Sequence, residues 1–280
     1  MDSRIFLVVV VAASIDALMH CLVKRSKDPF TLSLLVGMMG GVLGLMILPF
    51  SGLPERQSYP WLMASVAFGC LYWIFLGWAY QSNLLALVFP VARGTAILLI
   101  TAGAILILRE PLSVPGILAA LGVVTGLIVV SVSAAQTAFR LIALVPALAV
   151  AAAIAGFRLA DAGGIRVAGT VAGYCALIYI GNAIGVTLYA AWCHRARLQT
   201  LDRAALGQAI GLAAMSIGVY MTLLFALSQE HVAVVAVLAG SSIVFVSVFA
   251  KYLVLERPRP GHIAGVAMVA CGVAFLKLAQ

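Results

Sequence analysis

Two stretches of the chain repeat one pattern: LILREPLSVPGILAALGVVTG at residues 106–126 and YLVLERPRPGHIAGVAMVACG at residues 252–272. A constant offset of 146 residues superposes them and places Glu110 on Glu256. Each copy joins the end of an apolar run, a short acidic turn with prolines, and a second apolar run. The pattern predicts two five-helix repeats, residues 1–133 and 134–280, that end in the same turn and helix.

The composition predicts that lipid surrounds most of the chain. Hydrophobic residues make up 64% of its 280 residues and charged residues only 9%, whereas a soluble domain has about 45–50% apolar and about 25% charged residues. Lipid offers no partner to backbone N–H and C=O groups, so only α-helices and closed β-barrels cross it. The apolar runs are continuous over about 20 residues, unlike the alternating strands of about ten residues in a barrel. We therefore predict an all-α integral membrane protein.

Ten apolar runs predict ten transmembrane helices, five in each half. Because five is odd, consecutive halves insert with opposite orientation, which makes an inverted-topology repeat. Many secondary transporters have this architecture, with the substrate site near the membrane midplane between the halves. The predicted spans are residues 4–23, 30–50, 60–81, 84–108, 112–132, 138–157, 170–192, 204–227, 231–254 and 260–278.

Glycines four residues apart predict close contacts between helices, because they let two backbones approach each other. Such pairs include Gly37 and Gly41, Gly122 and Gly126, Gly181 and Gly185, Gly207 and Gly211, and Gly261 and Gly265.

The net charge of +8 does not predict nucleic-acid binding. Most lysines and arginines lie in short gaps between apolar runs, where they anchor helix ends at the membrane surface, and the sequence has no basic patch with interleaved aromatic residues. With the predicted spans, six Lys and Arg residues, Arg158 among them, flank the side of the N-terminus, and ten flank the other side. The positive-inside rule then places both termini outside.

The cysteines predict neither a metal site nor a redox pair. All five are scattered, mostly within apolar runs, and no CxxC spacing occurs, so they are typical of small buried hydrophobic residues. The sequence also has no GxxxxGK[ST] phosphate loop, so ATP is not the expected energy source. We predict no cofactor and no metal ion.

These features and three motifs resemble EamA-type transporters of the drug/metabolite transporter superfamily over nearly the whole chain. The motifs are FPVARGTAILL at 89–99, LREPLS at 108–113 and FRLADAGGIR at 157–166, which are similar to segments of one branch. The chain departs from that branch at 238–242, where Leu-Ala-Gly-Ser-Ser replaces the frequent Leu-Arg-Glu-Thr-Ser and removes a second arginine. The resemblance implies an inner-membrane transporter, usually an exporter of metabolites such as amino acids. It also implies cytoplasmic termini, opposite to the charge count.

Arg93 is the strongest candidate for a substrate-binding residue. It lies well inside a predicted span, where a lone charge costs at least about 2.5–3.5 kcal/mol, so it must face a cavity or a partner. A guanidinium in such a place binds a carboxylate or phosphate with two N–H groups. The alternative is a fixed salt bridge that holds two helices together. Pro90, one turn earlier, and Gly94 mark a predicted hinge, because proline frees backbone groups and glycine permits close approach.

Asp16 is the predicted partner of Arg93, because their depths in antiparallel helices differ by only about 3 Å at 1.5 Å per residue. His20 and Lys24 continue a polar stripe on the same helix face as Asp16. We predict that Asp16 holds Arg93 in the empty site and releases it on protonation or when an anionic substrate arrives. Asp16 or His20 would be the proton site. The alternative is that Asp16 neutralises Arg93 permanently and that His20 packs in a helix interface.

Other aromatic and polar side chains deep in the predicted spans complete the predicted pocket. An aromatic residue on a membrane helix more often packs or lies at the interface than contacts substrate, whereas an amide deep in lipid needs a partner. The additional predicted substrate-binding residues are Trp73, Tyr80, Tyr179, Asn182, Ser216, Tyr220 and Ser242. Glu110 and Glu256, by contrast, are expected to have a structural role in the turns.

The sequence as a whole predicts a secondary transporter, acting as an exporter by alternating access with proton coupling, for a small anionic or zwitterionic metabolite such as an amino acid. A membrane enzyme would need clustered acids and histidines or a Ser/His/Asp set, and the four histidines lie in four separate segments, so no catalytic residue is predicted. Alternatives are a cation exporter, a lipid-linked flippase and a non-transporting membrane subunit. The expected partners are the substrate, the lipid bilayer and a coupling proton, without nucleic acid, for a monomer or homodimer.

Overall fold

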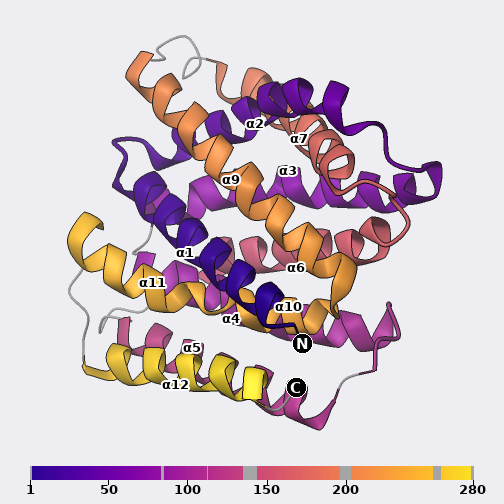
Figure 1. Ribbon diagram of the computed structural model, residues 1–280. Helices are drawn as coiled ribbons and strands as arrows, with labels where there is room; N and C mark the ends of the chain where they lie inside the picture. Colours follow the sequence, from indigo (N-terminus) through magenta and orange to yellow (C-terminus); the bar gives the residue numbers. More distant parts are fainter. Residues whose placement is uncertain are drawn as a thin grey trace.

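The structure is a computed structural model that describes residues 2–82, 85–111, 113–134, 144–195, 203–254 and 260–278. The regular structure in these ranges is helical throughout (Figure 1). The helices are α1 (Ser3–Arg25), α2 (Pro29–Ser51), η1 (Arg56–Ser58), α3 (Tyr59–Ser82), α4 (Leu85–Leu106), α5 (Val114–Ala134), α6 (Val145–Ile165), α7 (Val171–Cys193), α9 (Arg203–Gln229), α10 (Val232–Ala239), α11 (Ser242–Phe249), η3 (Ala250–Val254) and α12 (Pro260–Leu278).

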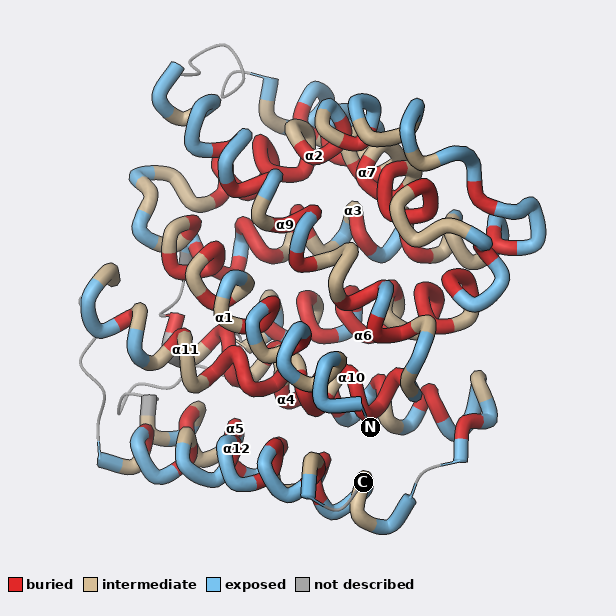
Figure 2. The backbone as a smooth tube through the Cα atoms, viewed as in Figure 1, coloured by how far each residue is buried: buried red, intermediate tan, exposed pale blue. Residues whose placement is uncertain are grey.

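The prediction of ten spans is confirmed for the part of the chain that the structure describes. Ten helical stretches there are long and apolar enough to cross a membrane, and α10, α11 and η3 together form the ninth. Buried residues gather between the helices (Figure 2), while Phe50 is 92% exposed and Trp192 is 91% exposed. Such apolar outer faces are suited to lipid rather than water. The chain therefore has an all-α, multi-pass membrane fold.

Helix starts follow local sequence rules. The Asp2 side chain accepts a hydrogen bond from the Arg4 N–H at 2.8 Å and caps α1. Asp28 caps α2 in the same way and is followed by Pro29, whose missing N–H suits the first turn of a helix. Thr170 caps α7.

The sixth span differs from the prediction. Residues 138–157 were expected, whereas α6 covers Val145–Ile165. The helix begins at this point because Pro146, in the first turn, has the backbone angle of a helix and lacks the N–H that a first turn leaves unpaired. The shift moves Arg158 and Asp161 from the predicted membrane flank into the helix, where Asp161 is completely buried.

The ninth span, predicted at 231–254, covers Val232–Val254 and is distorted at Gly240 and Ser241, which keep helical backbone angles. α10 ends at Ala239 and α11 begins at Ser242, after a tight turn in which the Gly240 N–H donates to the carbonyls of Ala236 and Val237, at 3.0 and 3.1 Å. The 146-residue offset places Gly240 on Gly94, where α4 continues without a break. The two halves therefore differ in backbone structure at equivalent positions.

Helices from the two predicted repeats pack along each other. α2 packs along α7 at one end of the molecule and α5 along α12 at the other (Figure 1). Between these pairs, α3 and α4 pack on α6, the first helix of the second half. In the same way, α9, α10 and α11 pack on α1, the first helix of the first half. Each of these contacts has a partner under exchange of the halves. The chain ends also meet, because Lys277 Nζ donates to Ser3 Oγ at 2.9 Å.

Glycines set the closest contact between α5 and α12. A Cβ atom at Gly126 would lie 2.7 Å from the Gly265 carbonyl oxygen, and one at Gly265 would lie 2.6 Å from the Gly126 oxygen. The predicted packing at this place is confirmed. It is wrong for Gly207 and Gly211, which are exposed on α9, with no described atom within 4 Å of a Cβ placed on either.

Glu110 joins the two halves. Its carboxylate accepts a hydrogen bond from the Val232 N–H at 2.9 Å and pairs with Arg166 Nη2 at 2.6 Å. A carboxylate at a helix N-terminus satisfies an unpaired N–H and opposes the helix dipole, so Glu110 caps α10. These contacts are structural, as predicted; Glu256 lies outside the described residues.

Candidate functional site

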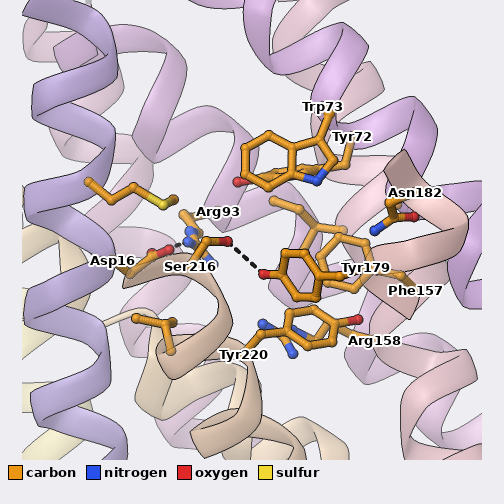
Figure 3. A pocket seen from close by; sticks show the side chains of 14 residues that line it. Asp16, Tyr72, Trp73, Arg93, Phe157, Arg158, Tyr179, Asn182, Ser216 and Tyr220 are labelled. Carbon is orange, nitrogen blue, oxygen red and sulfur yellow. Dashed lines mark hydrogen bonds and ion pairs between the residues drawn. The ribbon is translucent and has the colours of Figure 1, made fainter. Parts of the chain in front are cut away.

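A cavity of about 50 Å³ lies between helices of both halves (Figure 3). A cavity needs about 10–15 Å³ to hold one water, so this cavity is large enough to hold water. Its walls come from α1, α3, α4, α6, α7 and α9. The lining residues are Asp16, Met19, Gly69, Tyr72, Trp73, Arg93, Ile154, Phe157, Arg158, Tyr179, Asn182, Ser216, Val219 and Tyr220.

The predicted contact between Asp16 and Arg93 is confirmed. Arg93 Nη2 and Asp16 Oδ2 form an ion pair that links α4 to α1, and both residues line the cavity (Figure 3). The Phe89 ring lies beside the guanidinium, with its centre 5.2 Å from the guanidinium carbon. The side chains of Arg93 and Asp16 remain 12% and 14% exposed. A ligand in the cavity therefore has access to the pair.

His20 and Tyr80 were predicted to bind substrate, but the structure places them behind the ion pair instead of on the cavity wall. His20 Nε2 lies 3.4 Å from Asp16 Oδ1, and His20 Nδ1 lies 3.0 Å from the Tyr80 hydroxyl. Tyr72, which does line the cavity, approaches His20 Nε2 at 3.5 Å. Asp16 thus connects an arginine at the cavity with a buried imidazole on its other side.

The structure brings the other aromatic and polar candidates together at the cavity, except for Ser242. The Tyr179 hydroxyl and Ser216 Oγ are 2.6 Å apart and join α7 to α9. Asn182 lies against Gly69, where a Cβ atom would meet the amide oxygen at 2.6 Å, so glycine makes room for this amide. The predicted residues on the cavity wall are Asp16, Trp73, Arg93, Tyr179, Asn182, Ser216 and Tyr220.

The sequence did not predict Arg158 and Asp161 as site residues, because the sixth span was expected to end at residue 157. The Asp161 carboxylate accepts hydrogen bonds from the Tyr220 hydroxyl at 2.5 Å and from Ser65 Oγ at 2.6 Å. Arg158 Nη1 lies 4.0 Å from the same carboxylate. The proline in the first turn of α6 was the signal that would have placed both residues inside the membrane.

The Arg158 guanidinium lies close to two aromatic rings. Its central carbon is 5.1 Å from the centre of the Phe157 ring and 4.9 Å from that of Tyr220. Its side chain is 11% exposed, and the buried Nη1 atom has no hydrogen-bond partner among the described residues. Cation–π contacts stabilise the charge but leave this donor unsatisfied.

Ser242, Pro90 and Gly94 lie away from this cavity. Ser242 is fully buried at the start of α11, and its hydroxyl has no hydrogen-bond partner within the described ranges. Pro90 and Gly94 line a separate apolar groove of about 500 Å³, mostly between α4 and α5. α4 runs unbroken through both residues, so the hinge predicted there stays a prediction.

Metal binding has no support in the described residues, which contain no group of three or more His, Cys, Asp or Glu side chains placed to hold an ion.

Comparison with known proteins shows the fold and nothing further. No family model and no curated protein matches the chain. Among solved structures, 28 chains match. One of them, described only as a crystal structure of a protein, superposes with a TM-score of 0.73 at 18% identity over 99% of this chain and 96% of its own length. At this identity, the likeness carries no information on activity.

Proposed function

We propose that the chain is a secondary transporter of a small anionic or zwitterionic metabolite. The observation that carries the proposal is the Arg93–Asp16 ion pair on the wall of a cavity between the two halves. An intramembrane ion pair that is sealed on all sides serves packing alone. An ion pair that borders a cavity with aromatic and hydroxyl walls instead presents its guanidinium to an anion that enters the cavity.

The proposed mechanism exchanges the partners of Arg93. Asp16 neutralises Arg93 in the empty site, and the substrate's acidic group replaces it. The displaced carboxylate lies next to His20, whose imidazole would pass a proton to Asp16 in this mechanism. Proton binding and substrate binding then favour the same state of the pair, so each binding event promotes the other.

Alternating access requires two states that open to opposite sides. We propose that residues 1–133 and 134–280 form inverted repeats that rock against each other around the cavity. The helix contacts support this arrangement. A two-fold relation would exchange α2 with α7 and α5 with α12, and each of these two pairs is in contact. It would also convert the α3–α6 contact into the α9–α1 contact, and both contacts are present.

We also propose that the chain belongs among EamA-type drug/metabolite transporters and exports its substrate across the inner membrane. The support is the ten-span fold together with FPVARGTAILL at 89–99, which places Arg93 at the cavity. The missing arginine at position 239 sets this chain apart from the branch it resembles.

Thermal stabilisation of the purified protein tests the transporter proposal. A panel of amino acids, organic acids, phosphonates and quaternary amines is added to the wild type, to Arg93→Ala and to Arg4→Ala, an exposed arginine outside the cavity. A ligand that binds the folded state raises its stability by mass action. We expect anions or zwitterions to stabilise the wild type and Arg4→Ala but not Arg93→Ala. Stabilisation by cations, or by anions equally in all three proteins, would refute the role of Arg93.

The apolar groove of about 500 Å³ favours a second candidate, a lipid-linked anion flippase. An acyl chain fits this groove, but Val91 and Leu98, which line it, lie on a side of α4 different from the side that carries Arg93. The flippase mechanism therefore requires α4 to move aside. Stabilisation by lipid-linked anions, with no effect of soluble anions carrying the same headgroup, would select this candidate.

A further inference from the structure

Arg158 supplies the cavity with a second arginine. It lines the same cavity as Arg93, and both also line an adjoining space of about 20 Å³ beside Ala239. Ala239 is the repeat counterpart of Arg93 under the 146-residue offset, so the second half has no arginine at the equivalent position. Arg158 comes from α6 instead and lines that space. Figure 3 shows Arg158 on the wall of the larger cavity, beside Tyr220.

The two arginines differ in how their charge is balanced. Arg93 forms a direct ion pair with Asp16. The carboxylate nearest to Arg158 is that of Asp161, 4.0 Å from Nη1, which is beyond hydrogen-bonding distance, and both its oxygens already accept from the hydroxyls of Tyr220 and Ser65. A guanidinium has five N–H donors in a fixed plane. Arg158 therefore presents a cation whose Nη1 donor has no acceptor among the described residues.

A buried donor without an acceptor is costly, and a bound anion would remove that cost. The rings of Phe157 and Tyr220 hold the guanidinium from its faces but do not accept its N–H bonds along the edge. The structure thus has two guanidiniums on one small cavity, one contributed by each half of the chain. Arg93 has a carboxylate that a substrate can replace, and Arg158 has an Nη1 donor without an acceptor among the described residues.

We propose that Arg158 is a second anion-binding residue and that the substrate carries two negative charges. One acidic group replaces Asp16 on Arg93, and the other binds Arg158. This inference rests on the proposed transport function and narrows its substrate class. The cavity volume of about 50 Å³ requires the dianion to be compact. A short dicarboxylate and a phosphate group share this chemistry.

Three probes of similar size separate these cases: malonate, propionate and inorganic phosphate. Malonate and propionate have equal carbon counts and differ by one carboxylate, and phosphate carries its charge on one centre. Their dissociation constants are measured by calorimetry at pH 7.5 for the wild type, Arg158→Gln, Arg158→Lys and Arg4→Ala. We expect the wild type and Arg4→Ala to bind malonate or phosphate about 10- to 100-fold more tightly than propionate, as one extra charge-assisted contact predicts.

The ratio of dianion affinity to propionate affinity decides the outcome. A purely structural defect would weaken the binding of all three anions by the same factor and leave this ratio unchanged. We expect this ratio to fall to about threefold or less in Arg158→Gln and to an intermediate value in Arg158→Lys, which keeps the charge but not the planar fork. If Arg158→Gln does not fold, the drop in Arg158→Lys carries the test. An unchanged ratio in the variants overturns the role of Arg158 and leaves the transport proposal intact. Failure of every anion to bind the wild type overturns both. Tighter binding of malonate would identify the substrate as a dicarboxylate, and tighter binding of phosphate would identify it as a phosphate compound.

Discussion

Arg93 and Asp16 were paired correctly from sequence because depth along a helix follows directly from residue number. A rise of 1.5 Å per residue gives both residues nearly the same depth, and the ion pair is present. The direction in which a side chain points around the helix axis is harder to predict from sequence. His20 shares a face with Asp16, yet its ring turns away from the cavity toward Tyr80, because neighbouring helices decide which side of a polar stripe meets the cavity.

Replacing Asp16 tests the ion pair at this scale. Asp16→Asn leaves Arg93 without its carboxylate, and breaking a buried pair costs up to about 3–5 kcal/mol. We expect a lower thermal midpoint in detergent for Asp16→Asn and a partial recovery in Asp16→Asn/Arg93→Gln, which removes both charges. A double variant that is no more stable than the single one contradicts a direct pairing.

The same Asp16→Asn variant tests the exchange of partners. Without the competing carboxylate, we expect anionic substrate to bind more tightly than it binds the wild type, and with a weaker dependence on pH. The measurement is substrate affinity between pH 5.5 and 8. Unchanged affinity and an unchanged pH profile would remove Asp16 from the proposed mechanism.

At the scale of helices, apolar runs located nine of the ten spans to within a few residues. The sixth was misplaced because the apolar run before it extends upstream of the helix, and Pro146 marks the true start. The distortion at Gly240 was also missed, although Gly240, Ser241 and Ser242 interrupt the apolar run. A Cβ atom at Gly240 would lie 3.1 Å from the side chains of Ile97 and Val123, so glycine makes room for both.

Glu110 lends itself to an element-scale prediction, because it caps α10 from the other half. Glu110→Ala removes the hydrogen bond to the Val232 N–H and the pair with Arg166, which should cost about 1–2 kcal/mol. Thermal unfolding compares it with Glu55→Ala, an exposed glutamate whose side chain caps no helix. Equal stability of the two variants would show that the α10 cap contributes little.

Glycine contacts give a second prediction at this scale. Gly126→Ala places a methyl group 2.7 Å from the Gly265 oxygen, and overpacking of this kind costs about 1–3 kcal/mol. Gly207→Ala enters open space on α9 and should be neutral or stabilising by up to about 1 kcal/mol through helix propensity. Comparison of their unfolding midpoints checks both values; a destabilised Gly207→Ala would mean that this face is covered, for example by a second copy.

For the whole molecule, the repeat and the composition were enough to predict an all-helical bundle of ten spans. The side of the membrane was not decided, because two arguments oppose each other. Moving Arg158 into α6 leaves five basic residues, one fewer than six, on the side of the N-terminus against ten on the other. This strengthens the charge argument for external termini, whereas the EamA resemblance implies cytoplasmic ones.

Reporters fused to each end of the chain test the span count and the orientation together. Ten is even, so we expect both reporters to give the same side, in agreement with the contact between Lys277 and Ser3. Opposite sides would contradict ten spans. A cytoplasmic signal at both ends supports the family proposal, and an external signal supports the positive-inside count.

The contact between α5 and α12 has a mechanical consequence. At Gly126 and Gly265 the backbone oxygen of each residue lies where a side chain of the other would be, so the two helices interlock. If one helix slid by one residue along the other, a side chain would meet a backbone oxygen. A small rotation of one helix about the line of contact would keep each oxygen opposite a glycine. If the halves move, the contact between α5 and α12 therefore favours a rotation over a slide at this end of the molecule.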